Sequence, residues 1–532
     1  MKKNIDSEDH SNTGETFENV LSRRLARRSF LKGALVTAPL LFVGASLLRP
    51  QKVQAQNSGP STTAEPYLLP SIAGVETISI LTVGDSIGRY RMVGIPDGLG
   101  AFQDERGEFT LLVNHEITIQ KPGVVRAHGS NGAFVSRWAI DPDTLKVLAG
   151  EDLTQSPKDV FLWDALASKY VRETTVWQRL CSADLPAESA LFANGRGSRD
   201  RILFDGEEIN EGRAWARIAT GPHAGEAWQL PRLGRLSFEN VVASPHPQDK
   251  TVVVLLDDGN LNTAGVDTNF PSEVYVYIGT KKTGGQAIER AGLTNGDLYG
   301  VKISVNGNPV AEESNLFGLG TSTFVGSGRF SLHNLGDVSS LSALQLEQAS
   351  IVAGVARLRR VEDGAWDPRE EHSNDFYFVT TADINTNSRL WRLRFDDIEH
   401  PENGGTIEIL LNDDRYRMLD NVTIDRLGRI FMDEDPGNNN RVSKIWLYSI
   451  ATGDLVQVAE HNPKFFDPTI PNNGDFITQD EESSGIIDAS HILGEGWFLL
   501  DVQVHKVNNT DSELVEGGQL LAMFVDPGIG GD

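Results

Sequence analysis

The chain has 532 residues, of which 74 are Asp or Glu and 48 are Lys or Arg, so its formal net charge is −26 at pH 7. An acidic surface of this kind repels nucleic acids and anionic membranes, and it repels anionic substrates unless bound cations reverse the local field. The length suits a large repeat architecture or two domains, and a single cysteine excludes an internal disulfide.

The N-terminus predicts export. Residues 27–32 read Arg-Arg-Ser-Phe-Leu-Lys, an apolar run follows over residues 34–48, and Val53-Gln54-Ala55 is a small-residue cleavage site. This order is typical of a twin-arginine signal peptide, and the apolar run is shorter than the roughly 20 residues of a membrane span. We expect the twin-arginine export machinery as a partner, a periplasmic or secreted protein, no stable membrane anchor and a monomer.

The predicted domains are the signal peptide (1–55), a linker rich in Gly, Pro, Ser and Thr (56–66) and one folded domain (67–532). The sequence of the folded part predicts short strands that are bounded by the turn-forming residues Gly, Asp and Asn. The clearest strands are predicted at 109–113, 252–256, 274–278, 376–380, 390–395, 407–411, 429–432, 444–448, 497–502 and 519–524. Helices are predicted at 160–170 and 339–359.

Many short strands over more than 400 residues indicate an all-β fold, and we expect a β-propeller with a few helical insertions. A jelly roll or a tandem sandwich is the alternative, since no exact repeat of 40 to 50 residues is visible. Propellers gather loops at the mouth of a central channel, so residues far apart in sequence can share one site.

Polar and acidic residues occur where these strands end. Asn114 and Glu116 follow the strand at 109–113, and Asp258 lies in an acidic pair that follows the strand at 252–256. Paired carboxylates repel each other unless a proton, water or a cation bridges them, and calcium suits such oxygen ligands. An ordinary capped turn is the alternative. Two acidic triplets come later, Asp433-Glu434-Asp435 and Asp480-Glu481-Glu482.

Two further stretches combine metal-binding residue types. Cys181 is the only thiol, and in an exported protein it is either a buried core residue or a thiolate held by a metal. Arg360 and Glu362 point the same way in an extended segment, so the carboxylate can hold a metal while the guanidinium binds an oxyanion. A simple ion pair is the alternative.

Taken in order, these motifs resemble the PhoX-type bacterial alkaline phosphatases. The resemblance rests on the twin-arginine leader, Asn114-His115-Glu116, Cys181, Phe238-Glu239-Asn240, Asp257-Asp258, Arg360-Val361-Glu362, the Asp-x-x-Gly-Arg-Ile strand at 425–430 with its acidic end, and Val502-Gln503-Val504-His505. It spans nearly all of the chain after the leader. It implies a propeller of about six blades and a site with two irons, calcium ions and a cysteine thiolate on iron. The implied activity is hydrolysis of small phosphate monoesters, with attack by a metal-bound oxygen nucleophile.

The same resemblance implies a role for each motif residue. Cys181, Glu239 and Glu362 would be metal ligands, with Cys181 on iron, and Arg360 would grip the phosphoryl group. The remaining expected site residues are Asp258, Glu434 and Glu482 as calcium ligands, with Asn114 and Glu116 beside them as a catalytic and a metal-site residue.

The sequence around Cys181 departs from the better-known members of that family. It reads Arg-Leu-Cys-Ser-Ala-Asp, where they have a stretch like Asn-Cys-Ala-Gly-Gly, and Val361 stands where they have proline. Two alternatives therefore stay open. One is a non-catalytic, calcium-stabilised secreted propeller that binds a partner, and the other is a phosphodiesterase-like or phytase-like variant that keeps the metals.

Overall fold

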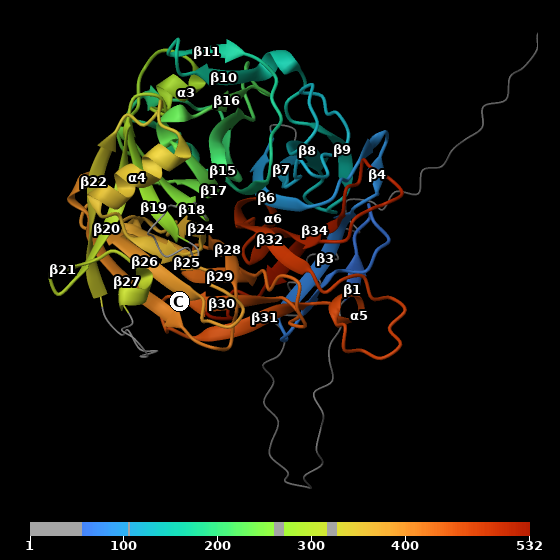
Figure 1. Ribbon diagram of the computed structural model, residues 1–532. Helices are drawn as coiled ribbons and strands as arrows, with labels where there is room; N and C mark the ends of the chain where they lie inside the picture. The colour runs from blue at the N-terminus through green and yellow to red at the C-terminus, as the bar shows by residue number, and fades with distance from the viewer. Residues whose placement is uncertain (1–55, 105–106, 260–270, 317–326, 532) are drawn as a thin grey trace, which may run out of the picture. The chain divides into compact units, whose positions relative to one another are not determined.

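Six groups of mostly antiparallel strands, arranged as the blades of a β-propeller, make up the described part of the computed structural model, and three neighbouring groups are joined at their edges into one continuous sheet (Figure 1). The structure describes residues 56–104, 107–259, 271–316 and 327–531, which belong to one compact unit. The prediction of an all-β propeller with a few helical insertions is confirmed. The predicted signal peptide, residues 1–55, lies outside the described residues.

Each blade consists of an inner strand followed outward by its hydrogen-bonded neighbours. Blade one is β6 (Pro96–Gln103), β7 (Phe109–His115), β8 (Phe134–Ile140) and β9 (Val147–Asp152). Blade two is β12 (Leu180–Asp184), β15 (Ile202–Ile218), β16 (Ala227–Gln229), β10 (Val160–Asp164) and β11 (Lys169–Arg172). Blade three is β17 (Arg235–Ala243), β18 (Lys250–Asp257), β19 (Pro271–Thr280), β20 (Asp297–Val305) and β22 (Ser327–Gly336), with β21 (Asn308–Val310) and β23 (Arg357–Arg359) at its edges.

The other three blades follow the same plan. Blade four is β24 (Val361–Trp366), β25 (Asp375–Thr380), β26 (Arg389–Phe395) and β27 (Gly405–Asn412). Blade five is β28 (Leu419–Ile424), β29 (Arg429–Glu434), β30 (Lys444–Ser449), β31 (Leu455–His461) and β2 (Leu68–Pro70). Blade six is β32 (Glu481–Asp488), β33 (Trp497–Val504), β34 (Gly517–Val525), β3 (Val75–Thr82) and β1 (Gln56–Ser58). Two small hairpins are β4 (Ser86–Ile87) with β5 (Tyr90–Arg91) and β13 (Phe192–Ala193) with β14 (Arg196–Gly197).

The inner strands form a closed ring. β6 packs against β12, and the order continues through β17, β24, β28 and β32 back to β6. Segments far apart in sequence close this ring, because β3 pairs antiparallel with β34 and β2 pairs antiparallel with β31. In Figure 1 the blue strand β3 accordingly lies beside the red strand β34. One strand from every blade therefore borders a shared central space.

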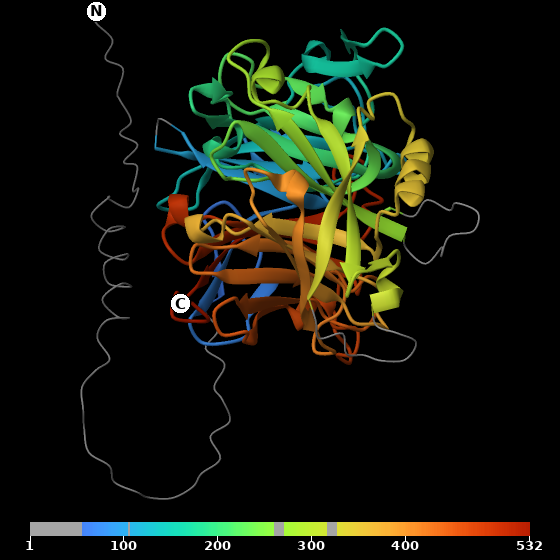
Figure 2. The ribbon, with the colours of Figure 1, turned by 90° about the vertical axis from the view of Figure 1, so that its left-hand side faces the viewer.

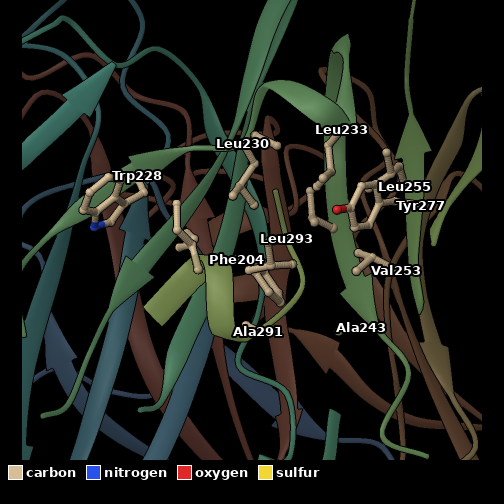
Figure 3. Close-up of a cluster of buried hydrophobic side chains, with 14 of the residues drawn as sticks. Phe204, Trp228, Leu230, Leu233, Ala243, Val253, Leu255, Tyr277, Ala291 and Leu293 are labelled. Carbon is tan, nitrogen blue, oxygen red and sulfur yellow. The ribbon is translucent and has the colours of Figure 1, made fainter. Parts of the chain in front are cut away.

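The hydrophobic core lies between neighbouring blades, and β18 shows why its sequence is apolar throughout. Val253 and Leu255 belong to a cluster shared with blade two, which includes Trp228, whereas Val252 and Val254 belong to a cluster shared with blade four. Figure 3 shows Val253 and Leu255 within the first cluster. A strand covered on both faces loses the polar alternation of a half-exposed strand and reads as a continuous apolar run.

All ten strands predicted from the sequence are present, but one of the two predicted helices is wrong. Residues 160–170 form the hairpin of β10 and β11, in which Phe161 stacks on Trp228 at 3.7 Å between ring centroids. The Asp164 side chain accepts hydrogen bonds from the amides of Leu166 and Ala167, so it stabilises the turn between the strands. Leu166 is fully exposed at the tip of this turn.

The second predicted helix is correct in its central part. Helix α4 (Ala343–Ala353) begins at Ser342, whose side chain accepts a hydrogen bond from the Gln345 amide, and ends at Gly354 in the left-handed conformation. Figure 2 shows this yellow helix on the outside of the sheets. The shorter helices are α2 (Glu188–Leu191), α3 (Ala287–Arg290), α5 (Pro463–Phe466), α6 (Ser490–Leu493) and the 3-10 turns η1 (Pro157–Asp159), η2 (Pro231–Leu233), η3 (Glu313–Leu316), η4 (Glu370–His372) and η5 (Pro401–Asn403). No helix within the described ranges is long and apolar enough to cross a membrane.

A buried histidine outside the central space predicts how stability depends on pH. The ring of His128 is packed against Trp177, and burial, reinforced by Arg217, lowers its pKa from 6.5 to about 4. Between these pH values the unfolded chain binds a proton that the native protein does not, so this residue's contribution to stability falls by about 3 kcal/mol as the pH drops from 6.5 to 4. We expect the free energy of unfolding, measured by urea denaturation, to fall more steeply over this pH range for the wild type than for the His128→Asn variant. Parallel pH profiles of the two proteins would contradict the prediction.

Candidate metal centre

A cavity of about 390 Å³ is lined by residues from five of the six inner strands and from the loops beside them. Its lining is dominated by carboxylates, with one thiol and a few basic side chains. The lining residues are Ile95, Glu116, Thr118, Lys121, Arg179, Cys181, Glu208, Glu239, Arg360, Glu362, Asp420, Asp435, Gly437, Asp480, Glu482, His505, Val515 and Glu516.

The candidate ligands occupy a repeated position. An acid or the thiol is the second residue of five inner strands, namely Asp97 in β6, Cys181 in β12, Glu362 in β24, Asp420 in β28 and Glu482 in β32. In four of these five strands the pairing register shifts across this residue, as it does across Glu239 in the remaining inner strand β17. A β-bulge re-aims a side chain, and the recurring bulges direct ligands from different blades toward one space.

The backbone just before these strands is equally regular. Ile95, Arg179, Arg360 and Met418 each directly precede an inner strand, and each has a positive φ between 42° and 58°. This conformation costs non-glycine residues about 1 kcal/mol or more, and its persistence is typical of functional sites. At Gly98 an added Cβ would lie 2.3 Å from the Ala183 nitrogen, so glycine permits the close approach of β6 and β12.

Four overlapping groups of side chains have donor atoms close enough to share a metal ion. Within each group, one ligand atom per residue lies within 4.8 Å of the others. The groups are Asp97–Glu116–Cys181, Cys181–Glu208–Glu239, Glu239–Glu362–Asp420 and Asp420–Asp435–Glu482. Because neighbouring groups share Cys181, Glu239 and Asp420, they form a continuous row of candidate cation positions.

Without cations, this arrangement is electrostatically unfavourable. Burial raises the pKa of the Cys181 thiol well above its usual value, and Asp97 and Glu239 raise it further. Burial and Glu362 likewise raise the pKa of Glu239, and burial and Glu116 raise that of Asp97. Divalent or trivalent cations reverse these shifts, because they favour the charged form of each ligand.

The donor set fits metal ions in a second respect. Asp97 Oδ1 and Asp420 Oδ1 are buried and have no hydrogen-bond partner, although buried polar atoms are normally paired. The two groups that contain Cys181 join a soft sulfur donor to carboxylates, which suits a transition metal, whereas the two all-oxygen groups suit calcium. The acidic clusters can therefore hold metal ions, and the thiol makes them chemically unequal.

Other side chains orient the candidate ligands. Gln503 Nε2 donates to Asp97 Oδ2 at 2.9 Å and to Glu116 Oε2 at 3.1 Å, so one amide fixes two carboxylates. Ser182 Oγ donates to Glu239 Oε1 at 2.7 Å, and Asn421 Nδ2 donates to the same hydroxyl at 2.6 Å. Such outer partners hold ligands in one orientation before a metal binds.

Arg360 contributes a cationic group to the lining. Its Nη2 lies 2.9 Å from Asp258 Oδ2 and 2.8 Å from Glu362 Oε1. Burial alone would lower the arginine pKa, but Glu362 and Asp258 outweigh it and the pKa is raised, so the guanidinium stays charged. A planar charged fork beside carboxylates that can hold metals is suited to binding a tetrahedral oxyanion.

The residues singled out in the sequence fall into two sets. Cys181, Glu239, Glu362, Glu482, Glu116 and Arg360 line the common cavity. The structure places Cys181, Glu239, Glu362 and Glu482 within inner strands and not in loops after strands. At the first three of these residues a bulge points the side chain inward.

Three of the singled-out residues do not line the cavity. Asn114 is buried behind it and donates from Nδ2 to the Cys181 carbonyl at 2.8 Å. Asp258 is held by Arg360, and Glu434 is held by Arg441 and by Trp446 Nε1 at 2.9 Å. Their geometry is that of residues that position others, and a metal role for Asp258 and Glu434 stays a prediction.

The sequence interpretation did not assign Asp97, Glu208, Asp420, Asp435 or Arg179 to the site. Asp97 and Asp420 share a position with Cys181 and Glu362, since each is the second residue of an inner strand. This repeat becomes visible only when the inner strands are located, because neither β6 nor β28 is among the strands predicted from the sequence.

Fold and site together define a six-bladed β-propeller with an acidic, thiol-containing central cavity suited to several cations. Neither the comparison with protein-family models nor the comparison with curated proteins found a match to this chain.

Among solved structures, the chain is similar to PhoX from Pseudomonas fluorescens in complex with vanadate, described as a transition state analogue. The identity is 12%, the match covers 87% of this chain and 97% of PhoX, and the TM-score is 0.58. A puromycin-hydrolysing peptidase from Mycobacterium tuberculosis also matches, at 10% identity over 82% of this chain and 48% of that one, with a TM-score of 0.32. The similarity to PhoX shows a shared fold.

Proposed function

We propose that this protein is a metal-dependent phosphatase of the PhoX type that hydrolyses phosphate monoesters. The observation that carries the proposal is the convergence of four candidate cation groups and the Arg360 guanidinium on one cavity. A solved structure of the same fold, PhoX, binds vanadate as a transition state analogue, which supports phosphoryl chemistry for this architecture.

The residues would divide the work as follows. Cys181 and its carboxylate neighbours would hold iron, and the all-oxygen groups around Glu362 and Glu482 would hold calcium. When bound, such cations supply positive charge for the phosphoryl oxygens and an activated water. Arg360 binds the phosphoryl oxygens with its planar fork and stabilises the charge that develops on them during transfer.

The protein scaffold contributes preorganisation. Gln503, Ser182 and Asn421 hold the ligands in place by hydrogen bonds, so little reorganisation is needed when the transition state forms. The same cations explain how an acidic protein accepts an anionic substrate, because they reverse the sign of the field in the cavity.

Removal of the metals tests the proposal. We expect the purified protein to hydrolyse 4-nitrophenyl phosphate, to lose this activity after treatment with a chelator, and to regain it when iron and calcium are restored together. Elemental analysis of the same samples gives the metal content at each stage. Full activity in a preparation shown to be metal-free would contradict the proposal.

Two controls separate the alternatives. If the metal-loaded protein hydrolyses bis(4-nitrophenyl) phosphate faster than the monoester, it is a phosphodiesterase-like variant. If it binds metals and hydrolyses neither substrate, it is a calcium-stabilised binding propeller. Assays after exchange of the metals identify the ions that support turnover.

A further inference from the structure

The cavity contains a second arginine that is built into the fold like Arg360. Arg179 and Arg360 each directly precede an inner strand, β12 and β24, and each adopts the left-handed conformation, with φ of 42° and 58°. Each stands two residues before a candidate metal ligand, Cys181 in one case and Glu362 in the other. Both line the same cavity, so the two guanidinium groups are related by the blade architecture.

The two arginines contact different carboxylates. Arg360 is paired with Asp258 and Glu362. Arg179 Nε lies 2.6 Å from Glu116 Oε1, and its Nη2 lies 2.5 Å from Glu208 Oε2.

These contacts place the arginines beside different candidate cations. Glu362 belongs to the group with Glu239 and Asp420, whereas Glu116 and Glu208 belong to the two groups that share Cys181. The candidate cation positions on the two sides of Glu239 thus each have their own guanidinium.

The Arg179 side chain is more exposed to solvent than that of Arg360. It is 41% exposed, against 22% for Arg360, and within the described ranges the Arg179 Nη1 donates no hydrogen bond, whereas its Nε donates to Glu116. A partly exposed guanidinium beside candidate cation positions, in a cavity of about 390 Å³, is suited to a second oxyanion.

We propose that Arg179 binds a second phosphate group of the substrate while Arg360 binds the phosphate that is hydrolysed, which makes phosphomonoesters with a second phosphate the preferred substrate class. This inference rests on the proposed function for its kinetic test. Its anion-binding part does not rest on the proposed function, because calorimetry can measure the binding of a second phosphonate group without turnover.

Kinetics on a matched substrate pair test the inference. Fructose 6-phosphate and fructose 1,6-bisphosphate differ by one phosphate, and we expect the metal-loaded wild type to have the higher kcat/KM on the bisphosphate. Loss of a charged hydrogen bond weakens binding by about tenfold or more, so Arg179→Gln lowers kcat/KM on the bisphosphate at least about tenfold more than on the monophosphate. Arg360→Gln lowers both by similar factors. The exposed Arg196, paired with Asp249 far along the chain, provides a control variant, Arg196→Gln, with wild-type values.

Binding measurements keep the inference separate from the proposed function. Calorimetry with propane-1,3-diphosphonate and with propylphosphonate, on metal-loaded wild type and Arg179→Gln, is expected to show a wild-type preference for the diphosphonate that the variant loses. Equal losses on both ligands, or no loss on either, would overturn the role of Arg179.

Inactivity of the wild type on all phosphoesters with the diphosphonate preference intact would overturn only the phosphatase proposal. If Arg179→Gln does not fold, Arg179→Met removes the charge and keeps a long side chain, and an unchanged preference in that variant would also overturn the role of Arg179.

Discussion

Replacing Cys181 with alanine is expected to remove iron from the purified protein and to lower phosphatase activity by more than about 100-fold. The thiol belongs to two of the four candidate groups, so its loss affects two cation positions at once. Losing an outer-shell partner alone costs about 10- to 100-fold in metal affinity or activity, and a direct ligand shared by two positions costs more. Elemental analysis and steady-state kinetics on 4-nitrophenyl phosphate measure the two effects.

Two comparison variants make this result specific. Cys181→Ser supplies an oxygen donor in place of sulfur and is expected to retain calcium while losing iron, because iron binds thiolate more strongly than calcium does. Val241→Ala shortens a buried side chain of β17 near Glu239 and should lower stability without changing metal content. Unchanged iron in a folded Cys181→Ala protein would return the thiol to a role in core packing.

Replacing Arg360 with glutamine is expected to lower kcat/KM on phosphate monoesters by about 100- to 1,000-fold, the range seen when one preorganised transition-state donor is removed. The effect falls mainly on kcat if the guanidinium contacts strengthen as charge develops on the phosphoryl oxygens. Inhibition by vanadate should weaken in parallel. Arg360→Lys keeps the positive charge but not the fork, and an intermediate loss is expected.

The chain offers a matched control at the next position. Arg359 pairs with Asp383 at 3.0 Å, has a similarly exposed side chain, and does not line the cavity. Arg359→Gln should therefore leave kcat/KM and vanadate inhibition close to the wild type. Equal losses in the two variants would show that Arg360 acts through the stability of this segment and not through contact with substrate.

The fold was largely predictable because its strands carry strong local signals. Runs such as Val252–Val254 are apolar since both faces of β18 are buried between blades, and that pattern is visible without a structure. The pattern at 160–170 predicts a helix, but these residues form a hairpin because β10 is stabilised by pairing with β16, which lies more than 60 residues away in the sequence. Tertiary pairing decides such short segments.

The site was predictable only in part. Cys181, Glu239 and Glu362 were identified from motifs, and the structure brings them to one cavity. Asp97 and Asp420 were not assigned, because a single acid at the start of a strand has no local meaning. Its significance depends on which strand of each blade lies innermost and on the bulges that turn the side chain inward.

The pairing of β3 with β34 determines when during protein synthesis the centre can exist. Blade six needs residues 75–82 together with residues 517–525, so nearly the whole chain must leave the ribosome before the ring can close. The candidate ligands grouped with Cys181 all lie within residues 97–239, whereas Asp420, Asp435 and Glu482 are translated much later, so the complete row of cation positions exists only after that closure. Metal loading of the complete row would therefore follow translation, and the ions would come from the compartment in which folding finishes.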